Sequence, residues 1–196
     1  AAIVGVTVTA IFVSTLRQSD DAFADCRASA VSGGGQIGGP FTLVDETGKT
    51  VTDKDVITKP SLIYFGYTFC PDICPADNAR NAVAVDLLKA RGYDVQPVFI
   101  SIDPKRDTPD VVAAFTDAMH PDMIGLTGSE EQVAAASKAY RTYYKIQDPN
   151  DPYYLVDHSV FTYLVLPKQG FVEFFNRNDS PEEMADRVAC FVDAAG

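Results

Sequence analysis

Basic side chains and histidines are scarce in this sequence. The chain has 196 residues, with 16 Lys and Arg, 27 Asp and Glu, two His and a formal net charge of −11. We therefore expect no nucleic acid partner, because phosphate binding needs clustered Lys and Arg. An acidic surface suits a partner with basic patches, and it equally serves solubility alone. The 46% hydrophobic content supports one domain with a sizeable core.

Charge is absent from residues 1–16, which are mostly Ala, Val, Ile and Thr, and Arg17 ends the run. A bilayer span needs roughly 17–25 apolar residues, so this run is slightly short. We expect an uncleaved transmembrane signal-anchor. A cleavable signal peptide, with residues 22–24 as a loose cleavage site, and a buried core helix are the alternatives. The anchor predicts a single-pass protein of the inner membrane with its globular domain in the periplasm, or of the mitochondrial inner membrane in a eukaryote.

Small residues dominate the next segment. Residues 17–39 contain the run Gly33–Gly35 and then Gly38 and Gly39 before Pro40. Such a composition predicts a flexible linker. The chain is thus divided into an anchor (1–16), a linker (17–39) and one folded domain (40–196).

Hydrophobic periodicity predicts alternating strands and helices in this domain. Continuous apolar runs predict buried strands, whereas 3.6-residue spacing and capping residues predict helices. The expected strands cover 41–44, 49–51, 61–67, 95–102, 123–126, 160–166 and 171–175, and the expected helices cover 79–90, 108–119, 129–144 and 180–193. Parallel βαβ units followed by a ββα unit indicate an α/β, thioredoxin-like fold: a central mixed sheet with helices on both faces.

A pair of thiols follows the expected strand 61–67. Cys70 and Cys74 are each followed by a proline, and a helical pattern begins shortly after them. A helix N-terminus lowers the pKa of a nearby thiol. The ordinary redox motif has two residues between its cysteines, whereas three intervene here, and the charge of Asp72 opposes thiolate formation. The spacing favours binding of a soft metal ion, and a Cys70–Cys74 disulfide is the alternative.

Proline is missing where thioredoxin-type oxidoreductases usually carry a cis-proline. No proline stands between Pro152 and Pro167, and His158 lies just before the expected strand 160–166. The loop that enters this strand faces the dithiol in such folds. Two thiolates and one imidazole form a soft donor set that suits copper, and Asp157 is a candidate to orient the ring. A strand-edge histidine without a ligand role is the alternative.

This donor set lacks what other metal sites require. Structural zinc usually takes four Cys or His ligands, and a blue-copper site takes two histidines and one cysteine. A dinuclear copper centre of the oxidase type carries a histidine four residues after its second cysteine, where this chain has Asn78. We predict a three-ligand copper site of Cys70, Cys74 and His158, with an open position for transfer to a partner.

Two cysteines and one histidine lie outside this set. Cys26 falls in the expected linker, and Cys190 lies among apolar residues of the last expected helix. Cys190 is either a small buried hydrophobic residue or the disulfide partner of Cys26, and sequence gives no distance to decide. His120 ends an expected helix, where a cationic side chain favours the helix dipole, and we assign it a structural role.

Three motifs resemble those of one protein family. They are GYTFCPDICP at 66–75, ISIDPKRDTP at 100–109 and YLVDHS at 154–159. With these motifs in this order, residues 41–192 resemble the Sco/SenC family, the membrane-anchored copper proteins of cytochrome c oxidase assembly. The turn PKQG at 167–170 departs from the Pro-Asp-Gly that is frequent in the family, and Cys26 and Cys190 lie outside its usual ligand set.

The resemblance implies a function as well as a fold. It implies a thioredoxin-like domain that holds Cu(I) or Cu(II) on Cys70, Cys74 and His158. It also implies delivery of the metal to the dinuclear copper A centre of cytochrome c oxidase subunit II, and a copper-donating chaperone is a further candidate partner.

Two functions remain open at this stage. A copper metallochaperone binds and transfers the ion without turnover, whereas a thiol–disulfide reductase cycles Cys70 and Cys74 to keep the cysteines of a partner reduced. Loss of His158 discriminates between them, because copper binding needs the imidazole and disulfide exchange does not. A peroxidase-like thiol enzyme fits less well, since its reactive cysteine lacks this close partner and the facing histidine.

Overall fold

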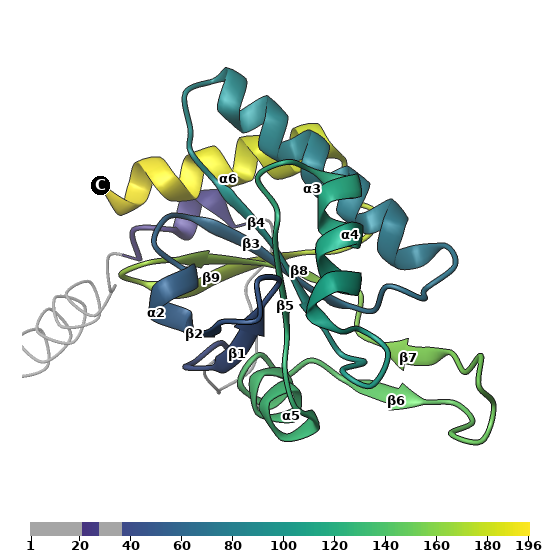
Figure 1. Ribbon diagram of the computed structural model, residues 1–196. Helices are drawn as coiled ribbons and strands as arrows, with labels where there is room; N and C mark the ends of the chain where they lie inside the picture. The colour runs from purple at the N-terminus through teal and green to yellow at the C-terminus, as the bar shows by residue number, and fades with distance from the viewer. Residues whose placement is uncertain (1–20, 28–36) are drawn as a thin grey trace, which may run out of the picture.

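The computed structural model describes residues 21–27 and 37–196 (Figure 1). The expected anchor 1–16 lies outside the described residues, as do 17–20 and 28–36 of the expected linker. Within the described part of the chain, no helix combines the length and apolar character needed to cross a bilayer.

A single mixed sheet of seven strands forms the centre of the domain. The strand order is β2-β1-β5-β4-β3-β8-β9. The pairs β3–β4 and β4–β5 are parallel, and the other neighbours are antiparallel. The bounds are Thr42–Asp45 (β1), Thr50–Thr52 (β2), Ser61–Gly66 (β3), Gln96–Ser101 (β4), Ile124–Thr127 (β5), Thr162–Leu166 (β8) and Gly170–Phe175 (β9). Every residue of β3 and β4 is buried, as their continuous apolar runs predict.

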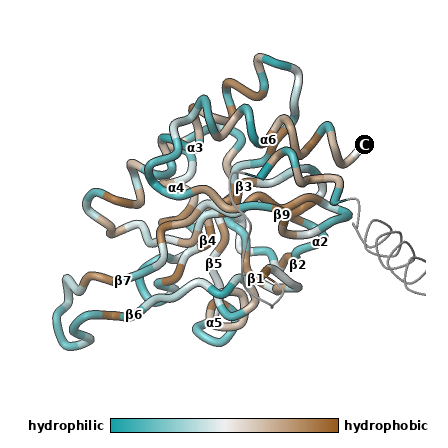
Figure 2. The backbone as a smooth tube through the Cα atoms, turned by 180° about the vertical axis from the view of Figure 1, so that it is seen from behind, coloured by the Kyte–Doolittle hydropathy of each residue, from teal (hydrophilic) through white to brown (hydrophobic). Residues whose placement is uncertain are grey.

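Helices cover both faces of this sheet (Figure 1). They are α2 (Asp53–Val56), α3 (Ile73–Ala90), α4 (Pro109–Met119), α5 (Glu130–Ala139) and α6 (Pro181–Ala195). Phe99 of β4 packs against Phe115 of α4 on one face, with 4.6 Å between ring centroids. Phe65 of β3 meets Tyr140, which follows α5, on the other face at 5.3 Å. The predicted thioredoxin-like fold is confirmed, and the hydrophobic segments gather in its central strands (Figure 2).

The serines before α5 and α6 cap these helices as the sequence predicts, whereas Thr108 stands at the predicted N-cap of α4 without a side-chain capping hydrogen bond. Ser129 and Ser180 each accept a hydrogen bond from the backbone N–H three residues later, which forms a capping box at the start of α5 and of α6. Pro109 occupies the first turn of α4 after Thr108, where its missing N–H costs nothing.

Two predicted helix boundaries are wrong. Helix α3 begins at Ile73 rather than at residue 79, because its first turns bury Asp77, Asn78 and Asn81, and buried polar residues hide the apolar period. Helix α5 ends at Ala139 rather than near Tyr144. Arg141 adopts φ 54°, a left-handed conformation that stops a helix.

A small second sheet was not predicted. Strands β6 (Tyr144–Ile146) and β7 (Val156–His158) pair as an antiparallel hairpin, with Tyr144 opposite His158. His158 is therefore the last residue of a strand and does not stand in a loop directly before β8, which begins at Thr162 rather than at residue 160. The hairpin projects from the body of the molecule (Figure 1).

A disulfide joins the N-terminal segment to the last helix. Cys26, at the end of the short 3₁₀ helix η1 (Ala24–Cys26), is bonded to Cys190 of α6, with 5.6 Å between the Cα atoms. Phe23 packs against Phe191 beside it at 5.3 Å. Of the two roles left open for Cys190, the structure shows the disulfide. Cys70 and Cys74 are free thiols.

We predict that this disulfide contributes about 2–5 kcal/mol to the free energy of unfolding, because it closes a loop that spans most of the chain. The double variant Cys26→Ser/Cys190→Ser should unfold at a correspondingly lower urea concentration than the wild-type chain. Titration of the unreduced, denatured protein with a thiol reagent should find the thiols of Cys70 and Cys74. Four reactive thiols would show that the bond does not form.

Candidate metal centre

The end of β3 and the start of α3 position the two free thiols. The loop 67–72 carries Cys70, and Cys74 is the second residue of α3. The backbone N–H of Cys74 donates to Cys70 Sγ over 3.3 Å. Gly66 must be a glycine, because a Cβ there would lie 3.0 Å from Cys74 Sγ and 2.8 Å from a ring carbon of Tyr64. The sheet thus approaches the helix N-terminus closely enough for backbone dipoles to act on sulfur.

Strand β7 brings His158 to the thiols. Its Nε2 lies 3.3 Å from Cys74 Sγ, and Nδ1 lies 2.8 Å from the carbonyl oxygen of Ser159. A carbonyl only accepts, so Nδ1 carries the hydrogen in the neutral ring and Nε2 keeps a free lone pair. The rings of Tyr64 and Tyr67 meet the imidazole edge to face, with centroids 6.2 Å and 5.8 Å away. The ring is therefore fixed with its donor nitrogen toward the thiols.

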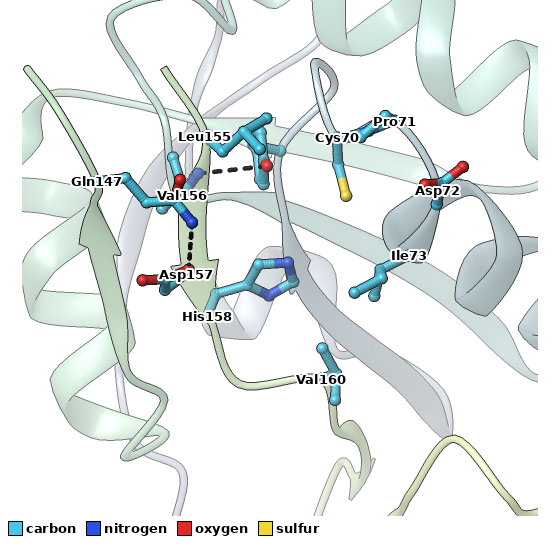
Figure 3. A pocket seen from close by; sticks show the side chains of 11 residues that line it. Cys70, Pro71, Asp72, Ile73, Gln147, Leu155, Val156, Asp157, His158 and Val160 are labelled. Carbon is cyan, nitrogen blue, oxygen red and sulfur yellow. Dashed lines mark hydrogen bonds between the residues drawn. The ribbon is translucent and has the colours of Figure 1, made fainter.

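The structure brings the three predicted residues together. The donor atoms of Cys70, Cys74 and His158 all lie within 4.8 Å of one another. Ligand atoms about 2.0–2.3 Å from one ion are separated by roughly 3.3–4.0 Å in tetrahedral or trigonal geometry, so small side-chain shifts bring all three onto a common ion. A cleft of about 310 Å³ opens beside them, and the sulfur of Cys70 and the ring of His158 point into it (Figure 3).

The two thiols have opposite acidities. Hydrogen bonding from the side chain of Cys74, with smaller contributions from backbone N–H groups, lowers the pKa of Cys70. Hydrogen bonding to Cys70 together with burial raises the pKa of Cys74. The chain therefore holds one thiolate and one thiol that share a proton, and a cation is the natural replacement for that proton.

A buried carboxylate that the sequence reasoning missed holds the Cys70 loop in place. Asp107 accepts from the backbone N–H of Thr68 at 3.0 Å and from the hydroxyls of Thr68 and Ser101 at 2.6 Å each. Asp107 is fully buried, and this burial raises its pKa, although the three hydrogen bonds act in the opposite direction. The motif 100–109 therefore fixes the segment that carries the first thiol.

A second carboxylate of the same motif holds the His158 side. Asp103, which is buried, accepts from the hydroxyl of Tyr154 at 2.7 Å and pairs with Arg106. The hydroxyl of Tyr67 accepts from the N–H of Val156 at 3.3 Å. The tyrosines in the dithiol and histidine motifs were the only sequence signal for these supporting contacts. Sequence could not pair them, because Tyr154 and Asp103 are 51 residues apart and Tyr67 and Val156 are 89 residues apart.

Two side chains near the motifs take other roles. The prediction that Asp157 orients the imidazole is wrong. The carboxylate of Asp157 accepts a hydrogen bond from Gln147 at 2.7 Å, and the carbonyl of Ser159 holds the ring instead. His120 lies away from the thiols. It contacts Asp86 at 3.3 Å and accepts from the N–H of Asp122 at 3.0 Å, which agrees with a structural role.

Comparison with known proteins identifies the relatives of this chain. The family model SCO1/SenC matches residues 29–193. The chain belongs to the SCO1/SenC family. It is 59% identical to protein SenC of Rhodobacter capsulatus over 99% of this chain and 88% of that protein. It is 44% identical to the mitochondrial protein SCO1 homolog 1 of Arabidopsis thaliana over 80% of this chain, which spans about half (47%) of that longer protein.

Solved structures agree with this assignment. The crystal structure of Arabidopsis thaliana ScoI with copper bound superposes with a TM-score of 0.76 at 43% identity, covering 80% of this chain and 99% of that one. Yeast Sco1 with copper bound gives the same TM-score at 38% identity, covering 81% and 90%.

The unequal acidity of the thiols predicts selective alkylation. Because its pKa is lowered, Cys70 should be a thiolate at neutral pH, and its rate with iodoacetamide should change little between about pH 6 and 8. An ordinary thiol reacts about tenfold faster per pH unit in this range. Cys74 should stay protected, since it is fully buried and its pKa is raised. Equal labelling of both cysteines in peptide maps would contradict this account.

The role of Asp107 predicts a stability loss with a defined pH dependence. Asp107→Ala removes three hydrogen-bond acceptances at a buried site and should cost about 2–4 kcal/mol near pH 4. Because the pKa of Asp107 is raised in the folded state, its contribution to the free energy of unfolding falls as pH rises through that pKa. The destabilisation caused by Asp107→Ala should therefore shrink toward pH 7. Exposed Asp117 supplies the control. Urea midpoints equal to those of Asp117→Ala would refute the role.

Proposed function

We propose that this protein is a copper metallochaperone that delivers copper to the dinuclear copper A site of cytochrome c oxidase subunit II. The observation that carries the proposal is the convergence of Cys70 Sγ, Cys74 Sγ and His158 Nε2 beside an open cleft. Its relatives of known structure include copper-bound Sco proteins at about 40% identity, and these support copper as the cargo.

The chemistry of the donors explains the choice of metal. Thiolates favour Cu(I), and an imidazole also suits Cu(II), so one site serves both oxidation states. Three protein ligands leave a coordination position free, and the cleft beside Cys70 and His158 gives an incoming ligand access to it. Copper binding displaces the proton shared by the thiols, so binding releases acid.

The remaining parts of the chain complete this proposal. Residues 1–16 would anchor the protein in the inner membrane, residues 17–39 would connect the anchor to the domain at 40–196, and the domain would act in the periplasm or, in a eukaryote, on the outer side of the mitochondrial inner membrane. A copper-donating chaperone would load the site. The charge of −11 suits partners with basic contact surfaces.

A thiol–disulfide reductase is the alternative function. The lowered pKa of Cys70, with Cys74 as a neighbouring thiol, is what attack on a disulfide requires. Cys70 would form a mixed disulfide with a partner cysteine, and Cys74 would resolve it. The partner would leave with two thiols and the chain with a Cys70–Cys74 disulfide, which needs an external dithiol reductant to reset.

Anaerobic titration of the 196-residue chain with Cu(I) and Cu(II) tests the proposal. We expect one equivalent of either ion to bind tightly, with sulfur-to-copper charge-transfer bands for Cu(II). His158→Ala should weaken binding by more than about tenfold and abolish the Cu(II) bands, because loss of a metal ligand exceeds the usual effect of a supporting residue. His120→Asn, a change at the other histidine, should behave like the wild type.

The same variants separate the two functions. If copper affinity and spectrum are unchanged in His158→Ala, the three-ligand site is wrong. If copper binds weakly while the chain reduces disulfide substrates equally well with and without His158, the reductase is the better description.

A further inference from the structure

The metal centre is recessed, which restricts the shape of any protein that takes copper from it. Cys74 is 0% exposed and Cys70 is 7% exposed, so a flat surface cannot bring a ligand to a copper ion between them. The cleft of about 310 Å³ is the route to these atoms. Since one water takes about 30 Å³ in the liquid, the cleft holds a protruding side chain with part of its loop.

An exposed aromatic pair adjoins residues that line this route: Phe69 precedes Cys70, and Tyr153 stands two residues before Leu155. The rings of Phe69 and Tyr153 are stacked with 6.3 Å between centroids and an interplanar angle of 27°. They are 45% and 71% exposed, and Leu155, which lines the cleft, is 38% exposed. Large apolar side chains that gather at one rim mark an interaction surface more often than scattered ones do.

A cation supports Phe69, and the exposed ring of Tyr153 stacks on Phe69. The guanidinium of Arg106 lies 4.6 Å from the Phe69 ring centroid and 3.6 Å from that of Tyr154. Arg106 is itself paired with buried Asp103. Tyr153 stands in the loop of the projecting β6–β7 hairpin (Figure 1). A surface fixed in this way loses little conformational entropy on binding.

The carboxylates that line the cleft are acidic, while the nearest cations, Lys145 opposite Asp157 and Arg106 against Phe69, lie outside its lining. Asp72 and Asp157 line it and are exposed, and no Lys or Arg lines it within the described part of the chain (Figure 3). Asp148 and Asp151 are exposed on the adjoining hairpin loop. An acidic rim around an apolar centre attracts a partner with the opposite pattern.

We propose that Phe69, Tyr153 and Leu155, with Asp72 and Asp157, form the docking surface for the copper-receiving protein, which inserts a protruding, ligand-bearing loop flanked by basic side chains into the cleft. This inference rests on the proposed function and names the contact that it requires. Cu(I) moves without a change of oxidation state. Bonds to the ligands of the partner form as those to Cys70, Cys74 and His158 break. The Cys70–Cys74 pair takes back the one proton that it shares when metal-free, and any further proton lost by partner thiols passes to solvent.

The test uses the full chain and, as the probe, the metal-free reduced copper A domain of an oxidase subunit II. Tyr153→Ser should bind this domain about tenfold more weakly than the wild type, as expected for an aromatic anchor, and transfer of Cu(I) should slow in proportion. Asp157→Asn should weaken binding about two- to threefold at low salt and flatten its salt dependence. Val83→Ser, a change at another exposed apolar residue (46%) on α3, and Asp117→Asn are the matched controls.

Loading of each variant from Cu(I)–glutathione separates docking from damage to the site. Unchanged loading with weakened partner binding supports the proposal. Slowed loading, wild-type affinity for the probe domain in Tyr153→Ser, or no complex with the wild-type chain would overturn it. A dimer of this chain that Tyr153→Ser dissociates would assign the surface to a second copy instead. Failure of the wild-type chain to bind copper would overturn the proposed function, a result distinct from these.

Discussion

Two buried carboxylates of one short segment hold both halves of the site. Asp107 fixes the loop that carries Cys70 through Thr68, and Asp103 fixes Tyr154, four residues before His158. Both carboxylates belong to the segment that follows β4. This one segment therefore fixes the position of the thiols relative to the imidazole. Small side-chain shifts then suffice for metal binding, and a preorganised site gains affinity because little order is imposed on binding.

Different elements around the site prepare the thiols, orient the imidazole and leave access for a partner. The helix N-terminus and the shared proton prepare the thiols for a cation, and the Ser159 carbonyl sets the tautomer of His158. The cleft leaves one side of the centre open. The Cys26–Cys190 bond ties residues 21–27 to α6, so a chain truncated at Gly39 would carry an unpaired Cys190.

Sequence reasoning predicted the convergence of Cys70, Cys74 and His158 because the thiols follow a central strand and His158 precedes β8, the strand whose entry faces the dithiol in such folds. It misplaced the start of α3 and put His158 in a loop rather than at the end of β7. It missed Asp103 and Asp107 as supports, since their partners are distant in the chain and hydrogen bonding leaves no periodic pattern. The β6–β7 hairpin was missed because the conformation of Arg141, rather than any composition change, ends α5. The sequence could not decide whether Cys26 and Cys190 form a disulfide, because it does not give the distance between their Cα atoms.

The central claim is that copper sits among two sulfurs and one imidazole nitrogen. X-ray absorption at the copper edge, on the full chain loaded anaerobically with one equivalent of Cu(I), measures this ligand set directly. The account predicts two sulfur scatterers and one nitrogen scatterer per copper, with the imidazole outer-shell signal lost in His158→Ala and retained in His120→Asn. A spectrum with nitrogen and oxygen scatterers alone, or one unchanged by His158→Ala, would contradict it.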